Sequence, residues 1–164
     1  MALILGLSML THINDKNQPQ MVDVSEKKIR LRTAHAQAEV FLPDNIFELI
    51  QSNELNSKKG PVFQTAIIAG VMAAKQTGNL IPFCHPISLE DCRITIEIKE
   101  KNYVRIDCIA KVESKTGVEM EALTGVSMAA LTIYDMCKAM SHDIKVQNIQ
   151  LISKTGGKKN FKRV

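Results

Sequence analysis

Two neighbouring stretches of the chain alternate between apolar and polar residues, the pattern of a half-buried β-strand. The first covers residues 93–99 and the second residues 104–112, with a polar turn over residues 100–102 between them. We expect these stretches to form a hairpin with one buried face. Residues 30–41 and 144–152 carry less regular apolar patterns and are predicted to form two further strands.

Three segments with helical periodicity accompany these strands. A short helix is expected to begin at Pro43-Asp44, with Asp44 as its N-cap. A second helix opens at residues 58–61 and is predicted to end at Gly78, and the longest helix covers residues 116–141. The order of elements predicts an α+β fold in which helices pack on one face of an antiparallel sheet. The residues of the short helix that are expected to face inward are Ile46, Leu49 and Ile50.

The longest predicted helix carries two charged residues where apolar residues are expected. One of its faces is wholly apolar, and a second apolar stripe contains Asp135 and Lys138. A helix that is apolar on two faces is mostly buried, and burying a charge costs several kcal/mol unless that charge is paired or used. Asp135 and Lys138 are therefore predicted to be half-buried site residues. The alternative is a structural ion pair one helical turn apart. The wholly apolar face consists of Val126, Ala130, Ile133, Cys137 and Met140.

A histidine lies between two prolines in the segment Pro82-Phe83-Cys84-His85-Pro86. Each proline restricts its own backbone and that of the preceding residue, so His85 projects from a stiff segment that suits a substrate contact. The alternative is a loop histidine bonded to a nearby carbonyl. Cys84 is interpreted as a small buried apolar residue, because no further Cys or His pair completes a metal site.

Glutamates and lysines supply further candidates. Glu119 fits a capping box with Thr116 at a helix start, whereas Glu121 has no such structural role. Lys59 precedes a helix start, where the helix dipole favours an anion. Residues 154–159 form a glycine-rich turn with flanking lysines, which suits phosphate. For any single lysine, however, a solvated surface charge is the ordinary role.

The composition limits the classes of protein to which the chain can belong. With 164 residues, 45% of them hydrophobic, we expect an N-terminal extension over residues 1–20, partly flexible, followed by a single domain over residues 21–164. Lys and Arg exceed Asp and Glu by 21 to 17, a mild excess that fits an anionic partner without requiring a nucleic acid. Five Phe, two Tyr and no Trp supply a poor stacking surface for single-stranded nucleic acid.

The cysteines and the apolar segments bear on location. The four cysteines form no C-x-x-C pair, so reduced thiols and a cytoplasmic protein are expected. Residues 1–10 are apolar but lack the basic start and the cleavage site of a signal peptide. No segment reaches the length of a membrane span, so we expect no membrane partner.

Five segments together carry a resemblance to a known family. They are Leu10–Asn14, Met21–Ser25, Leu80–Pro86, Lys115–Thr124 and Ile133–Lys138, in this order along the chain. In these segments the chain resembles the cyclic pyranopterin monophosphate synthase family of molybdenum cofactor biosynthesis, the MoaC family. Residues 1–8 precede the usual start of that family, so Met9 is a candidate initiator.

The resemblance implies a fold, an assembly and a reaction. It implies a ferredoxin-like sandwich and a homohexamer built as a trimer of dimers. The implied reaction converts (8S)-3',8-cyclo-7,8-dihydroguanosine 5'-triphosphate to cyclic pyranopterin monophosphate with release of pyrophosphate. No redox cofactor is expected, and Mg²⁺ on the triphosphate is supported by no ligand motif. A radical enzyme would supply the substrate, which implies a handover and transient contact with that enzyme.

The resemblance also assigns roles to the candidates. Asp135 and Lys138 are expected to form an acid–base pair, in which burial lowers the pKa of the lysine and the lysine keeps the aspartate ionised. Basic residues are expected to neutralise the triphosphate. The alternative function is a non-catalytic module that binds nucleotides or RNA. The expected substrate-binding residues are Arg32, Lys59, Phe83, Cys84, His85, Glu119, Met120, Glu121 and Lys154.

Overall fold

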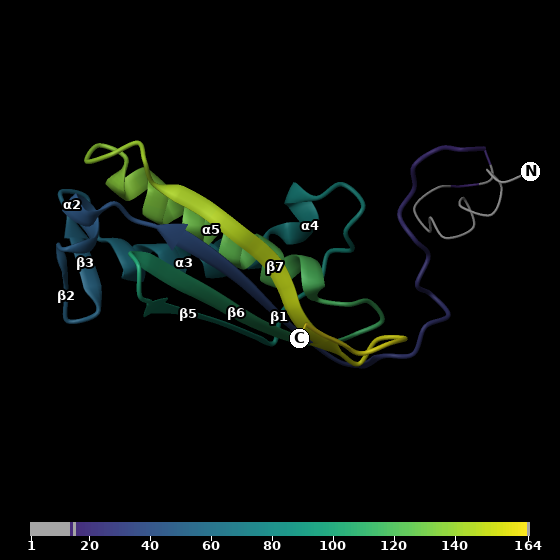
Figure 1. The fold of residues 1–164 in the computed structure, drawn as a ribbon. Helices are drawn as coiled ribbons and strands as arrows, with labels where there is room; N and C mark the ends of the chain where they lie inside the picture. The colour runs from purple at the N-terminus through teal and green to yellow at the C-terminus, as the bar shows by residue number, and fades with distance from the viewer. Residues whose placement is uncertain (1–13, 15, 164) are drawn as a thin grey trace, which may run out of the picture.

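A five-stranded antiparallel sheet forms the centre of the molecule (Figure 1). The computed structural model describes residues 14 and 16–163. The strands lie in the order β5-β6-β1-β7-β8, and every neighbouring pair is antiparallel. The predicted hairpin and the strand predicted over residues 30–41 are both confirmed. The strands are β1 (Arg30–Phe41), β5 (Asp91–Ile98), β6 (Tyr103–Ser114), β7 (Lys145–Thr155) and β8 (Phe161–Lys162).

Two long helices cover the same face of this sheet, which confirms the predicted α+β fold (Figure 1). They are α3 (Val62–Lys75) and α5 (Glu119–Cys137). Two short helices, α2 (Asp44–Phe47) and α4 (Thr77–Leu80), lie outside this layer. A small second sheet joins β2 (Ile50–Gln51), β3 (Glu54–Ser57) and β4 (Gly60–Pro61).

Small residues let the two helices and the sheet pack closely. A Cβ atom added to Gly70 of α3 would overlap the side chain of Ile94 and the carbonyl oxygen of Gly125 in α5. On the sheet, β1 turns a row of buried alanines toward the helices, because alternate residues of a strand share one face. The helices therefore lie near the strands, and most of the apolar area of the fold is buried between them.

The predicted ends of the long helix are wrong. The helix begins at Glu119, with Val118 as its N-cap, and no side chain caps it, so the predicted capping box of Thr116 and Glu119 does not form. Its last helical residue is Cys137 rather than residue 141. The second helix ends at Lys75, where the hydroxyl of Thr77 bonds back to the carbonyls of Ala73 and Ala74. A side chain that satisfies the last carbonyls allows the helix to end earlier than Gly78.

The short helix also differs from its prediction. Asp44 is its first helical residue and Pro43 takes the N-cap position, so Asp44 is not the N-cap. The Asp44 carboxylate accepts a hydrogen bond from the side chain of Asn102 instead. Ile46 is buried as predicted, whereas Leu49 is exposed and Ile50 belongs to β2.

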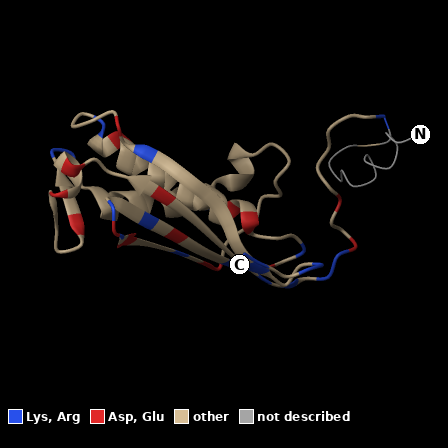
Figure 2. Cartoon of the chain, viewed as in Figure 1, with Lys and Arg blue, Asp and Glu red and all other residues tan. Residues whose placement is uncertain are grey.

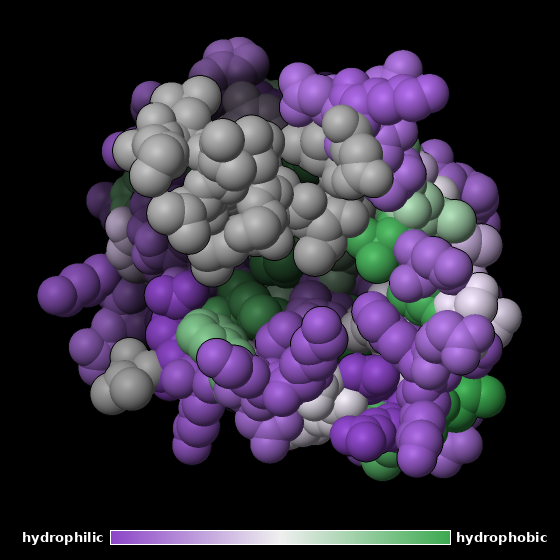
Figure 3. All heavy atoms as spheres, turned by 90° about the vertical axis from the view of Figure 1, so that its right-hand side faces the viewer, coloured by the Kyte–Doolittle hydropathy of each residue, from purple (hydrophilic) through white to green (hydrophobic). Residues whose placement is uncertain are grey.

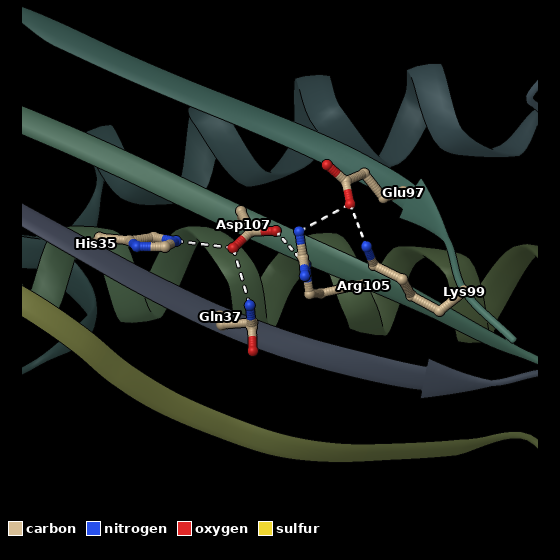
Figure 4. A network of polar contacts seen from close by, with 6 residues as sticks. All are labelled: His35, Gln37, Glu97, Lys99, Arg105 and Asp107. Carbon is tan, nitrogen blue, oxygen red and sulfur yellow. Dashed lines mark hydrogen bonds and ion pairs between the residues drawn. The ribbon is translucent and has the colours of Figure 1, made fainter. Parts of the chain in front are cut away.

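The outer face of the sheet is polar and carries a charge network (Figure 4). The Asp107 carboxylate lies 2.8 Å from Nε2 of His35, and it accepts hydrogen bonds from the side chains of Gln37 at 3.0 Å and Arg105 at 2.8 Å. Arg105 and Lys99 both pair with Glu97. Burial by itself would raise the pKa of Asp107, but the hydrogen bonds outweigh it and lower that pKa.

Two predictions concern the N-terminus and the membrane. Most of the extension predicted over residues 1–20, including Met9 and the family segment Leu10–Ile13, lies outside the described residues. Within residues 14 and 16–163, the structure contains no helix that combines the length and the apolar composition needed to cross a membrane.

Candidate functional site

Two adjoining cavities form one cleft where α5 begins and β7 ends. Their volumes are about 570 and 750 Å³. We call the first the basic half of the cleft and the second the mixed half. The residues that line both halves are Lys27, Thr116, Gly117, Glu119, Lys154 and Lys158.

The basic half is lined by eight lysines and arginines and a single carboxylate, that of Glu119. Lys and Arg gather where β1 begins and β7 ends (Figure 2), and the same end of the molecule presents mainly hydrophilic side chains (Figure 3). Such a concentration of cations attracts a multiply charged anion. The eight cations are Lys27, Lys28, Arg30, Arg32, Lys115, Lys154, Lys158 and Lys159.

A glycine lets the chain after β7 fold over β1 to complete this half. Gly156 has a φ of +79°, and a Cβ atom there would overlap the carbonyl oxygen of Leu31. Glycine is the residue that tolerates both conditions. The neighbouring Arg32 side chain is buried and donates hydrogen bonds to the carbonyls of Ser114 at 3.3 Å and Lys115 at 3.2 Å. Arg32 therefore holds β6 in place as well as lining the cleft.

Lys154 and Glu119 form an ion pair across the cleft. The Lys154 ammonium lies 2.7 Å from Oε1 of Glu119. Gly117 allows this arrangement, because a Cβ atom there would overlap the folded-back carboxylate of Glu119. Glu119 thus serves as the counter-ion of a cleft lysine rather than as a helix cap.

Besides the shared Glu119 and Lys154, the mixed half brings together five more of the predicted residues: Phe83, Cys84, His85, Met120 and Glu121. Nε2 of His85 lies 2.8 Å from the carbonyl oxygen of Val22, so the segment that precedes β1 packs on the histidine. Burial, with a smaller contribution from the charge of Glu121, raises the pKa of the Cys84 thiol. Cys84 is therefore a thiol rather than a thiolate at neutral pH.

Glu121 is a buried carboxyl group at the wall of the mixed half. Its residue is only 3% exposed, and burial raises its pKa to about 7, with a further rise from the charge of Glu119. A carboxyl group with such a pKa exchanges its proton near neutral pH, which suits acid–base chemistry. The helix position of Glu121, three residues into α5, points it into the wall of the cleft rather than toward solvent.

Asp135, Lys138 and Lys59 form a second charge centre, which we call the triad. The Asp135 carboxylate lies 2.7 Å from the Lys138 ammonium and 2.8 Å from the Lys59 ammonium. The Lys59 ammonium also donates to the backbone carbonyl of Asp135 at 3.1 Å. Sequence reasoning named all three residues but did not place Lys59 with the other two.

This pair is half-buried as predicted, but the predicted lowering of the Lys138 pKa is wrong for a single chain. The side chains of Asp135 and Lys138 are 53% and 50% exposed. Hydrogen bonds from Lys138 and Lys59 lower the pKa of Asp135 to about 2, and the bond to Asp135 raises the pKa of Lys138 instead of lowering it. The same helix stripe leaves Leu131 53% exposed. The wholly apolar face is buried as predicted, except that Met140 is half-buried.

Within one chain the cleft and the triad are far apart. Asp135 lies 16 residues after Glu119 in α5, which at a rise of about 1.5 Å per residue corresponds to roughly 24 Å. The sequence suggested that Lys59, Arg32 and Lys154 form one anion site. Within one chain they do not, because Lys59 lies at the triad.

Several cleft residues were missed by sequence reasoning. Lys27 and Lys28 follow the Met21–Ser25 segment after one intervening residue, which was the available signal. Their distance along the chain from Lys154 concealed their common site. Across the described part of the chain, no group of three or more His, Cys, Asp or Glu side chains is placed to hold a metal ion.

Comparisons with known proteins agree on one family. The family model of the MoaC family matches residues 21–157. The chain is 47% identical over 152 residues to "Cyclic pyranopterin monophosphate synthase" of Xanthomonas campestris pv. campestris, covering 93% of this chain and 92% of that protein. It is 48% identical over 171 residues to "Molybdenum cofactor biosynthesis protein 1" of Dictyostelium discoideum, covering 94% of this chain but only 27% of that protein.

A third relative is also much longer than the matched region. The "Molybdenum cofactor biosynthesis bifunctional protein" of Synechocystis sp. is 51% identical over 154 residues, which cover 92% of this chain and 44% of that protein. The chain therefore spans less than half of two of these relatives and nearly all of the third. With its matched family model and these levels of identity, the chain belongs to the MoaC family.

Proposed function

We propose that the chain is a cyclic pyranopterin monophosphate synthase, a lyase that converts (8S)-3',8-cyclo-7,8-dihydroguanosine 5'-triphosphate to cyclic pyranopterin monophosphate and pyrophosphate. The observation that carries this proposal is the two-part cleft, in which eight cations adjoin a half lined by a histidine and two glutamates. A nucleotide with a triphosphate at one end and a polar ring system at the other matches this division. The Xanthomonas relative of nearly equal length carries the name of this enzyme.

The basic half would bind the triphosphate and the departing pyrophosphate. Lys154, Arg32 and Lys27 border it from three different segments of the chain. Cations fixed before the reaction stabilise negative charge that builds on a leaving group. The ion pair between Lys154 and Glu119 would open as phosphate oxygens replace the carboxylate.

The mixed half would hold the ring system. His85 and Met120 reach it from two different segments, and the aromatic ring of Phe83 adds an exposed apolar surface. Glu121, with a pKa of about 7, can accept or return a proton within this half. Cys84 supports the wall as a neutral thiol.

The triad would act as the proton donor to the substrate. In the single chain Lys138 keeps its proton and Asp135 is ionised, so Lys138 is the acid of the pair. A covering surface that excluded water would lower the pKa of Lys138 and ease proton transfer. Lys59 holds Asp135 from the other side.

A second copy of the chain would bring a triad to each cleft. The separation of about 24 Å along α5 prevents one chain from joining the two centres by itself. Three large apolar side chains of α3 and α5 are more than half exposed, namely Ile68, Met72 and Leu131. An apolar helix face next to the triad fits an interface between subunits. We propose a homo-oligomer, a hexamer built as a trimer of dimers, in which clefts are completed by the partner's triad.

Other features support a proposal for the pathway and for the compartment. Two relatives extend far beyond the matched region, and one is named a bifunctional protein of molybdenum cofactor biosynthesis. Their names support partners within molybdenum cofactor biosynthesis. We propose that one of these partners is the radical enzyme that supplies the substrate, and that the contact is transient. The described thiols Cys84, Cys92, Cys108 and Cys137 are free, which supports a reducing compartment such as the cytoplasm.

The alternative function, a nucleotide- or RNA-binding module, predicts basic and aromatic residues on an exposed sheet. The outer face of this sheet carries the aromatic pair Phe41 and Tyr103 at one end, but its central carboxylates Asp107 and Glu97 are each paired with neighbouring cations. A salt titration of RNA binding distinguishes the two functions, because a backbone binder loses affinity steeply with salt.

The proposed function is tested by incubating the purified protein with the cyclised nucleotide. We expect pyrophosphate and cyclic pyranopterin monophosphate in equal amounts, detected by a pyrophosphate assay and by mass spectrometry. Guanosine triphosphate is the matched control and should release no pyrophosphate. Substrate that remains unchanged at stoichiometric enzyme would contradict the proposal.

A further inference from the structure

The first turn of α3 is capped by a side chain from another element. Pro61 is the N-cap of α3 and has no side chain that could accept a hydrogen bond. The first N–H groups of a helix need acceptors from elsewhere. Glu54 of β3 provides them: its Oε1 accepts from the N–H of Phe63 at 2.8 Å and its Oε2 from the N–H of Gln64 at 3.1 Å. A carboxylate at this end also complements the helix dipole.

The same glutamate begins the hairpin that carries Lys59. Strands β3 and β4 pair through Ser57 and Gly60, so Lys58 and Lys59 form the turn between them. The Ser57 hydroxyl accepts a hydrogen bond from the N–H of Lys59 at 3.1 Å and donates to the carbonyl of Gly60 at 3.2 Å. The backbone of Lys59 is thereby tied to β3, and Glu54 ties β3 to α3.

The Lys59 ammonium ends this chain of contacts at Asp135. It donates to the Asp135 carboxylate at 2.8 Å and to the Asp135 carbonyl at 3.1 Å. The Lys59 side chain is half exposed, and exposed ion pairs contribute little to holding their own geometry. The position of this ammonium must therefore come from the backbone to which it is attached.

We propose that Glu54 is a positioning residue for the reaction, which acts by clamping the β3–β4 hairpin to α3 so that Lys59 meets Asp135. The proposal rests on the proposed function, in which Lys59 belongs to the triad. Without the clamp the hairpin keeps its own pairing but moves relative to α3 and α5, so the Lys59 ammonium spends less time at Asp135. Glu54 itself lies at the base of the hairpin and touches neither Asp135 nor Lys138.

The test is a double-mutant cycle between Glu54→Gln and Lys59→Ala. Glutamine keeps the size of the side chain but turns its amide N–H toward one of the two helix N–H groups. We expect Glu54→Gln to lower kcat roughly tenfold with a smaller change in KM, and to lower it no further once Lys59 is alanine. The melting temperature should fall in both backgrounds. A purely structural glutamate would lower kcat by the same factor with or without Lys59, and that result would overturn the proposal.

A second measurement does not depend on turnover. Lys59 contributes to the low pKa of Asp135, so an NMR titration of the Asp135 carboxyl reports whether the lysine is in place. Glu54→Gln should raise this pKa in the wild-type background and leave it unchanged in Lys59→Ala. If the wild-type protein fails to convert the nucleotide, the proposed function fails while this titration still decides the role of Glu54. An Asp135 titration unaffected by Glu54→Gln would overturn the proposal.

Two further variants address a failure of Glu54→Gln to fold and a general loss of stability. Glu54→Asp keeps the charge but shortens the side chain, and it replaces Glu54→Gln if that variant does not fold. We expect it to have smaller effects than Glu54→Gln on kcat and on the Asp135 titration. Ile94→Val loosens the packing under the middle of α3 near Gly70 and serves as the stability control. At a similar loss of melting temperature it should leave kcat unchanged. A tenfold loss of kcat in Ile94→Val would show that any loosening of α3 suffices, and would also overturn the proposal.

Discussion

The ammonium of Lys154 lies 2.7 Å from the carboxylate of Glu119, which joins the end of β7 to the first residue of α5. The pair spans the point at which the basic and mixed halves of the cleft meet. In the proposed function a bound triphosphate would displace the carboxylate from the lysine, so the same cation would serve first the ion pair and then the ligand.

Lys154→Ala should therefore weaken binding of a non-hydrolysable triphosphate analogue. The loss of one charge-assisted hydrogen bond corresponds to about 1.5 to 3 kcal/mol, or roughly ten- to a hundredfold in affinity. The melting temperature should barely change, because the lysine is partly exposed. Isothermal titration calorimetry measures the affinity, and Lys162→Ala on β8, outside the cleft, is the control. Unchanged affinity with reduced stability would mean that Lys154 is structural.

Glu121 should make the protein less stable as pH rises toward neutrality. Its pKa is about 7 in the folded chain against an ordinary value of 4.5, so between these values the folded chain holds a proton that the unfolded chain has lost. Stability falls through that window and stays lower above it. Glu121→Gln should remove this dependence and be more stable at pH 8 by at most about 3 kcal/mol, with little difference at pH 4.

Urea unfolding at several pH values provides the measurement for Glu121. Glu113→Gln, at an exposed position of β6, should leave the pH dependence of the wild type intact. The expectation would be contradicted if the free energy of unfolding changed between pH 5 and 8 by the same amount in the wild type and in Glu121→Gln.

Asp107 should have the opposite dependence. Its pKa is lowered in the folded chain, so its contribution to stability is present above the unfolded value near 4 and is lost as pH falls below it. Asp107→Asn should lower stability at pH 7 and flatten the loss of stability in acid, while turnover stays at the wild-type level. Acid titration followed by circular dichroism checks this, with Glu100→Gln in an exposed turn as the control. If a folded Asp107→Asn protein lost turnover, the prediction would be wrong, and the outer face of the sheet would affect the reaction.

A double substitution distinguishes a catalytic role of Asp135 and Lys138 from a structural role. Asp135→Leu with Lys138→Met removes both charges at an exposed surface, so the protein should fold and still bind the triphosphate analogue through the cleft. Turnover should fall at least about a hundredfold, the usual scale of lost acid–base catalysis. Near-native turnover in the folded double variant would remove both residues from the mechanism and leave His85 and Glu121 as candidates.

Mixing two inactive variants tests whether subunits share sites. Lys154→Ala damages only the cleft and Lys138→Met only the triad, so mixed assemblies contain some sites in which both parts are intact. Co-expression should restore about a quarter of wild-type activity if each cleft uses the triad of its partner. Light scattering should show an oligomer in every case. A monomer, or no recovery in mixed oligomers, would contradict shared sites.

Much of the fold could be predicted because its cause is local. The period of two in residues 93–99 and 104–112 follows from a sheet with one covered face, and the hairpin is confirmed. Helix ends depend on distant or neighbouring side chains, such as the hydroxyl of Thr77 that bonds back to α3. Such contacts leave no periodic signal, so the predicted ends of the second and long helices were wrong.

The site was predicted in parts rather than as a whole. Sequence reasoning named Lys59 and Asp135, but their contact spans 76 residues and became visible only in the fold. The expected lowering of the Lys138 pKa failed for a related reason: periodicity shows which residues share a helix face, and it does not show whether that face is covered within one chain. Residues Lys27 and Lys28 join Lys154 only through the pairing of β1 with β7.

The helix α5 fixes the spacing between the two charge centres, since Glu119 opens it and Asp135 lies in its last turn. Removing or adding one residue in between would shift Asp135 along the axis by about 1.5 Å and turn it by about 100° around the helix. No side chain rotation recovers such a displacement. Evolution of this enzyme can therefore change residues within α5 far more freely than it can change their number.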